Sequence, residues 1–163
     1  MTRWRDNTSL AVLARLVLGA VFIKQGLSKT ADPVAFLKLI REYDMVPEGL
    51  PWLLNGMAVG LPWLEVLAGA LLLAGVAVRG ASLALLSLLV VFTTVIALRA
   101  FGIQEAEGLA YCDIAFDCGC GSGPVNVCTK LAENAGLLLA SLVGVASRST
   151  AWCLRARVLG DDV

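Results

Sequence analysis

The sequence predicts an all-α integral membrane protein whose residues 1–163 form one domain, a four-helix bundle in the lipid bilayer. Of the 163 residues, 58% are hydrophobic and 16% are charged, whereas a soluble domain carries about 25% charged residues. The mean hydropathy is +0.80. A helix needs roughly 20 apolar residues to cross a bilayer. Four apolar runs approach this length, at residues 10–27, 49–78, 80–98 and 131–147.

The composition also excludes several classes of function. Thirteen Lys and Arg residues balance thirteen Asp and Glu residues, so no overall basic field attracts nucleic acid. The chain contains no His, which excludes Ser-His-Asp and Cys-His catalysis as well as His-ligated zinc and haem. The function is therefore sought among the few polar residues of a membrane protein.

The first two runs each contain charged residues. Residues 10–27 are interrupted by Arg15 and Lys24. Since no small-x-small cleavage site follows them, they are predicted to form a retained helix rather than a signal peptide. The second run, residues 49–78, is the longest and has Glu65 as its one charge.

The third and fourth runs complete the bundle. Residues 80–98 contain no charge, and residues 131–147 are fewer and carry Glu133 near their start. Because lipid offers the backbone no hydrogen-bond partners, all four runs are predicted to be helices.

Residues 31–50, between the first two runs, are too polar to span a membrane. Asp32 followed by Pro33 is typical of a helix start, with Asp as N-cap and Pro in the first helical position. Apolar residues then recur at helical spacing, namely Phe36, Leu39, Ile40 and Tyr43. We therefore expect an amphipathic helix at the membrane surface, ending before Pro47.

Four spans place both termini on the same side of the membrane as the turn at Arg79. That side has six Lys and Arg residues and the other side has five, a small excess that favours cytoplasmic termini. The long connection at residues 99–130 would then lie outside the cytoplasm.

This connection contains four of the five cysteines, which are Cys112, Cys118, Cys120 and Cys128. Disulfides persist outside the cytoplasm, and Cys153, past the last span, is predicted to face the reducing side. Loops of about 30 residues in compact domains are usually functional or disordered. The cysteines are therefore the first candidate site.

Cys118 and Cys120 are separated by one Gly, so a bridge between them would be strained and easily reduced. This spacing favours thiol–disulfide exchange through Cys118 and Cys120, with Cys112 and Cys128 as a second pair. A structural alternative has two bracing disulfides, for example Cys112–Cys118 and Cys120–Cys128, and three connectivities are possible. A zinc or iron–sulfur site is disfavoured, because the spacing C-x5-C-x-C-x7-C matches neither usual pattern.

Glu65 is the second candidate site, because a carboxylate within a span is costly unless it is paired, hydrated or protonated. Pro62 removes a backbone hydrogen bond one turn earlier. Lys24 is predicted to lie at similar depth and to be its partner. The pair is interpreted either as a structural ion pair or as a proton or quinone-headgroup site beneath the cysteines.

Three segments resemble a known family. RLVLGAVFIKQGLSKTADPVAF and the Pro-Trp-Leu-Glu ending at Glu65 are similar to DoxX-like membrane proteins. DCGCGSGPV resembles the Cys-x-Cys loop of their redox-associated branch, the MauE (methylamine-utilisation) family. The similarity covers roughly residues 13–147.

The resemblance implies a multi-pass protein of the bacterial or archaeal inner membrane. It further implies a role in maturing methylamine dehydrogenase, whose small subunit is rich in disulfides, beside a thioredoxin-like partner. Cys118 and Cys120 match the family's Cys-x-Cys pair, and Glu65 and Lys29 match two of its polar landmarks. The chain departs from the family at Gly121, where Phe often stands, and in having Cys112 and Cys128.

Two functions follow as hypotheses. In the first, the protein exchanges electrons with a periplasmic thioredoxin-like or disulfide-containing protein through the Cys-x-Cys loop. Quinone near Glu65 would be the electron acceptor, by analogy with the vitamin K epoxide reductase class. In the alternative, it is a non-catalytic anchor or docking subunit of a respiratory or dehydrogenase complex, with a disulfide-braced loop.

Overall fold

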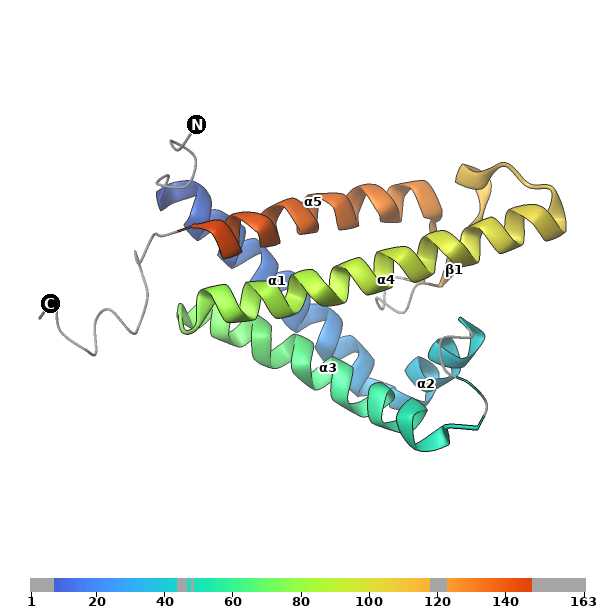
Figure 1. The fold of residues 1–163 in the computed structure, drawn as a ribbon, viewed down its shortest axis with the longest axis horizontal. Helices are drawn as coiled ribbons and strands as arrows, with labels where there is room; N and C mark the ends of the chain where they lie inside the picture. Colours follow the sequence, from blue (N-terminus) through green and yellow to red (C-terminus); the bar gives the residue numbers. More distant parts are fainter. Residues whose placement is uncertain (1–7, 44–46, 48, 118–122, 148–163) are drawn as a thin grey trace, which may run out of the picture.

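The structure is a computed structural model that describes residues 8–43, 47, 49–117 and 123–147. Within these residues, four helices are long and apolar enough to cross a membrane. They are α1 (Thr8–Ala31), α3 (Pro51–Ala74), α4 (Val78–Glu107) and α5 (Val127–Ala146). Figure 1 shows them as one elongated bundle, which confirms the predicted fold class.

The helix ends differ from the predicted runs. α3 stops at Ala74 because Gly75 adopts a left-handed conformation, with φ of 70°, which ends helices readily when the residue is Gly. α4 extends nine residues beyond the predicted end at residue 98, to Glu107. At 30 residues it is about 45 Å long, roughly 15 Å more than the hydrocarbon core. The helix is therefore longer than the hydrocarbon core requires.

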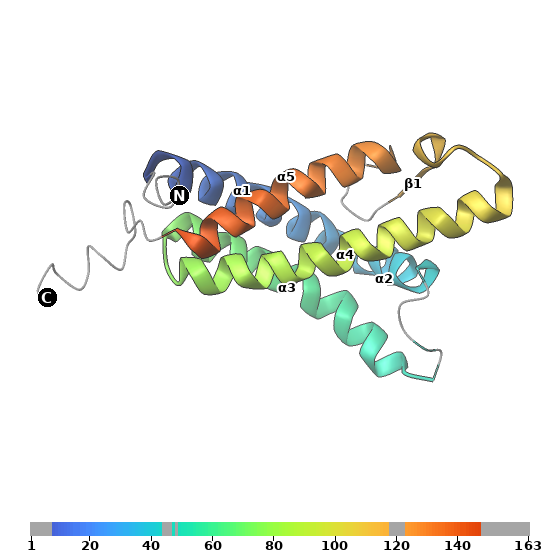
Figure 2. The ribbon, with the colours of Figure 1, turned by 45° about the horizontal axis from the view of Figure 1, so that its top comes forward.

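The predicted amphipathic helix is present as α2 (Pro33–Glu42). The Asp32 side chain accepts a hydrogen bond from the Ala35 backbone N–H at 2.9 Å, as expected of an N-cap. Phe36 and Ile40 are buried against Ala58 of α3. Figures 1 and 2 show the first half of α3 diverging from α4, with α2 in the angle between them.

The outward surface of the bundle is apolar. Large hydrophobic side chains on every span are more than a third exposed, including Leu13, Leu67, Val90 and Leu139. An exposed apolar surface of this extent is what lipid contact requires. The core cluster includes Leu18, Leu72 and Leu85. Many other apolar residues of the spans lie outside it, on the outward surface.

α1 and α3 pack closely through glycines. A Cβ atom on Gly69 would lie 2.8 Å from the Gly19 carbonyl oxygen and 2.8 Å from Ile23 Cγ1. The missing side chains therefore let the two backbones approach, as small residues do in membrane helix pairs. This contact fixes the vertical register between the two helices that carry Lys29 and Glu65.

Replacing Gly69 by Ala is expected to destabilise the bundle by about 1–3 kcal/mol, because the added methyl group overpacks the α1–α3 contact. The measurement is reversible unfolding by SDS in mixed micelles. Gly60→Ala on the same helix is the matched control, since its Cβ would meet nothing within 4 Å. Equal stability of the two variants would show that the close contact is absent.

Candidate functional site

A short β-hairpin occupies the connection between α4 and α5. β1 (Ala115–Asp117) and β2 (Pro124–Asn126) are antiparallel, and a 3-10 helix, η1 (Tyr111–Asp113), precedes them. Asp117 is paired with Pro124, so residues 118–123 connect the two strands. These strands were not predicted from the sequence, because three-residue strands are too short to show a periodic pattern.

A disulfide joins Cys112 to Cys128 beside the base of the hairpin, with the two Cα atoms 5.1 Å apart. This is the pair that the redox hypothesis assigned together. The pairing Cys112–Cys118, given as an example for the structural alternative, is wrong. Cys118 and Cys120 lie outside the described residues and follow β1 directly in the sequence.

The hairpin is attached firmly to the ends of the spans. Ile114 and Val127 are buried against Ala100 of α4, and the Val127 N–H donates to the Ile114 carbonyl at 3.0 Å. The Tyr111 hydroxyl donates to the Ala97 carbonyl at 3.3 Å. These contacts and the disulfide hold the strand ends in place on α4 and α5.

Glu65 forms a buried ion pair with Lys29, and the prediction that Lys24 would be its partner is wrong. The Lys29 Nζ and Glu65 Oε1 atoms are 2.5 Å apart, and their side chains are only 6% and 1% exposed. Lys24 is exposed on the surface of α1. The difference arises because five residues rotate a helix by about 140°, so Lys24 and Lys29 lie on different faces.

Aromatic rings complete the surroundings of Lys29. Its ammonium lies 5.1 Å from the ring centroid of Phe36 on α2 and 5.1 Å from that of Phe92 on α4. Both distances are within the range of cation–π attraction. The ammonium is therefore held by a carboxylate and two rings contributed by three different helices.

All four spans meet at a small cavity of about 30 Å³ beside this pair. Lys130 and Asn134 of α5 bring further polar groups to its wall, and both residues are buried. Gln25 of α1 also lines it, with Phe22, Leu89, Phe92 and Ile96 as apolar neighbours. The cavity brings together charged and amide side chains from α1, α3 and α5.

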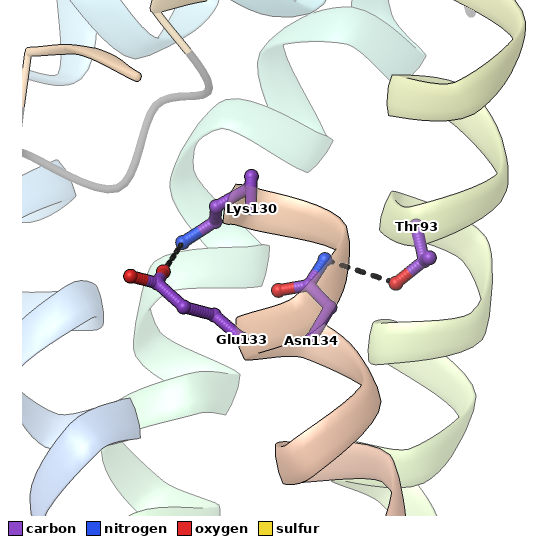
Figure 3. Close-up of polar contacts among 4 residues, drawn as sticks. All are labelled: Thr93, Lys130, Glu133 and Asn134. Atoms are coloured by element: carbon purple, nitrogen blue, oxygen red, sulfur yellow. Dashed lines mark hydrogen bonds and ion pairs between the residues drawn. The ribbon is translucent and has the colours of Figure 1, made fainter. Parts of the chain in front are cut away.

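Figure 3 shows how the polar residues of α5 are oriented. The Lys130 Nζ donates to Glu133 Oε2 at 3.2 Å, and the Asn134 Nδ2 donates to Thr93 Oγ1 of α4 at 3.0 Å. The Glu133 side chain is 55% exposed. Lys130 therefore reaches from the cavity wall toward the surface.

Sequence reasoning missed Lys130, Asn134 and Phe92 as residues of this cavity wall. Lys130 and Asn134 are four residues apart, so they share one face of a helix. That spacing was a usable signal for an inward polar face on the fourth span. Phe92 had no comparable signal, because an aromatic residue in an apolar run is expected against lipid or core.

The cysteine hairpin and the cavity are close along the chain. Cys128 and Lys130 are two residues apart at the start of α5, and Asn134 follows about 9 Å from Cys128 along the helix axis. The disulfide and part of the cavity wall therefore lie on consecutive turns of α5.

The chain is similar to a known protein family. The family model described as methylamine utilisation protein MauE matches residues 7–147, a range that includes every span, the hairpin and the cavity. No curated protein and no solved structure matches the chain.

Proposed function

This chain belongs to the methylamine utilisation protein MauE family, and from that membership we propose that it is a membrane thiol–disulfide redox protein. Its partner would be a thioredoxin-like protein or a disulfide-containing substrate outside the cytoplasm. Maturation of methylamine dehydrogenase is the process in which it would act. Cys118 and Cys120 are the residues proposed to exchange electrons with that partner.

The observation that carries the proposal is the Cys112–Cys128 disulfide. With these two sulfurs bonded to each other, Cys118 and Cys120 are the one pairing left within the loop. A Cys-Gly-Cys bridge is short and strained, and strained disulfides are the readily reduced and catalytic ones.

The proposed exchange conserves disulfide bonds, electrons and protons. A thiolate from Cys118 or Cys120 attacks a disulfide sulfur of the partner, and the partner's other sulfur leaves as a thiolate. The second loop cysteine then attacks the mixed disulfide, which forms the Cys118–Cys120 bridge and releases the partner as a dithiol. Two electrons and two protons pass to the partner, and the reverse sequence oxidises it.

Cys112 and Cys128 are proposed as the second pair of the relay. A quinone or proton site near Glu65 is also part of the proposal, with Lys29 in the place that was predicted for Lys24. Lys29 and Asn134 border the cavity next to Glu65, and this cavity would have to widen to admit a quinone ring. A proton could reach Glu65 without any widening of the cavity.

The proposed topology places the hairpin outside the cytoplasm and both termini inside it. An oxidising compartment supports the persistence of the Cys112–Cys128 bridge. The four apolar helices are those of a multi-pass membrane protein, and the inner membrane of a bacterium or archaeon is the proposed location.

A docking subunit is the second candidate, and the same disulfide favours it, because a bridge across the hairpin base would brace a binding surface. In that case both bridges would be structural. The protein would then remain bound to a larger respiratory or dehydrogenase complex after extraction from the membrane.

Mild reductant separates the two functions. For the redox protein, we expect the Cys118–Cys120 bridge to open at reductant concentrations that leave Cys112–Cys128 intact, because the single residue between Cys118 and Cys120 strains their bridge. Differential alkylation followed by peptide mass mapping measures both bridges, and a Cys153→Ser background prevents exchange with the fifth thiol. If both bridges resist reduction equally, the docking function is supported instead.

A further inference from the structure

One oxygen of the buried carboxylate has no protein partner. Glu65 Oε1 is bonded to Lys29, but Oε2 accepts no hydrogen bond from any residue that the structure describes and is shielded from the surface. Leaving a charged acceptor unsatisfied in a buried position costs about 1–3 kcal/mol or more. The residue lines the central cavity, so a ligand there can satisfy this oxygen.

The charges around the cavity determine which ligand charge is favoured. Lys29 and Lys130 are positive, and Glu65 and Glu133 are negative and each bonded to one of them. An added cation would meet two ammonium groups, and an added anion would meet the Glu65 carboxylate. The site therefore favours a small neutral molecule that donates hydrogen bonds.

The cavity volume limits the size of this neutral ligand. A buried water requires about 10–15 Å³ and two to four polar partners, and the cavity measures about 30 Å³. Asn134 uses its amide nitrogen on Thr93, which leaves its carbonyl oxygen as a second acceptor. Gln25 and Lys130 on the cavity wall add further polar groups.

We propose that this cavity is a water-binding site, in which one or two ordered waters donate to Glu65 Oε2 and connect it to Asn134 and Lys130. The exposed Glu133, bonded to Lys130, marks the route by which these waters exchange with the solvent. Glu65 is thus an intramembrane carboxylate in hydrogen-bonded contact with the aqueous phase. The water site would be present whether or not Cys118 and Cys120 exchange electrons with a partner.

Water-edited solid-state NMR of the full chain, labelled with ¹³C-Glu and held in lipid bilayers, tests the site. The Glu65 carboxyl signal is assigned by its loss in Glu65→Gln, or by its loss in Glu65→Asp if the first variant does not fold. We expect magnetisation from water to reach Glu65 nearly as fast as it reaches the exposed Glu133. No transfer to Glu65 when Glu133 is fully polarised would show a dry cavity and overturn the proposal.

Two variants locate the water. Asn134→Leu keeps a similar side-chain volume but removes the polar partner at the cavity wall, and we expect it to abolish the transfer to Glu65. Thr93→Val removes the same Thr93–Asn134 hydrogen bond without altering the wall, so the transfer should persist. Equal transfer in both variants would place the water elsewhere and contradict the proposed site.

Discussion

Replacing both Cys118 and Cys120 by Ser is expected to abolish thiol transfer to partner proteins while the four spans remain inserted in the membrane. Serine cannot form or exchange a disulfide, so no mixed disulfide with a partner can arise at these positions. The spans depend on apolar helices and on contacts such as that between Gly19 and Gly69, which the substitutions do not touch. The expected effect is therefore a complete loss of activity without loss of the fold.

The measurement is the oxidation state of disulfide-containing partner proteins in cells, followed by the gel shift of thiols labelled with maleimide–polyethylene glycol. The single variant Cys120→Ser should in addition accumulate a mixed disulfide through Cys118, because the resolving thiol is missing. Cys153→Ser is the matched control, since that cysteine lies outside the loop. Unchanged disulfide formation in the double variant would refute thiol exchange.

Breaking the Lys29–Glu65 pair from either side is expected to destabilise the protein by about 3–5 kcal/mol, because the remaining partner becomes an uncompensated buried charge. Lys29→Met and Glu65→Leu remove one charge each while keeping an apolar side chain of similar length. The double variant removes both charges. It should therefore lose less stability than the sum of the two single variants.

SDS-induced unfolding in mixed micelles, followed by tryptophan fluorescence, measures these effects. Lys24→Met is the control on the same helix, and because Lys24 is exposed its effect should stay below about 1 kcal/mol. Additive losses in the double variant would mean that the two side chains do not interact. An effect of Lys24→Met as large as that of Lys29→Met would contradict the assigned partner.

Apolar runs and local helix signals were sufficient to predict the spans and α2. The Asp32-Pro33 start needs only neighbouring residues to be recognised, and it appears in the structure as expected. The last nine residues of α4 were missed because hydropathy identifies the lipid-embedded part of a helix. From Arg99 to Glu107 charged residues interrupt the apolar run, so hydropathy gives no sign that the helix continues.

The candidate sites depend on packing between distant segments, which is why they were only partly predictable. Lys29 lies three residues after Gly26 and seven after Phe22, and all three are buried on the face of α1 that meets the rest of the bundle. Recognising that face would have favoured Lys29 over Lys24. No comparable local signal existed for the Cys112–Cys128 pair, because sequence alone permits three connectivities.

The length of α4 bears on how a partner could reach the hairpin. From Arg99, the first charge after the apolar run, to Glu107 the helix rises about 12 Å, whereas each headgroup layer adds only about 5–8 Å to the hydrocarbon core. The top of α4 thus stands clear of the phospholipid headgroups. A folded, water-soluble protein could therefore contact the end of α4 and the hairpin from the side without first displacing lipid.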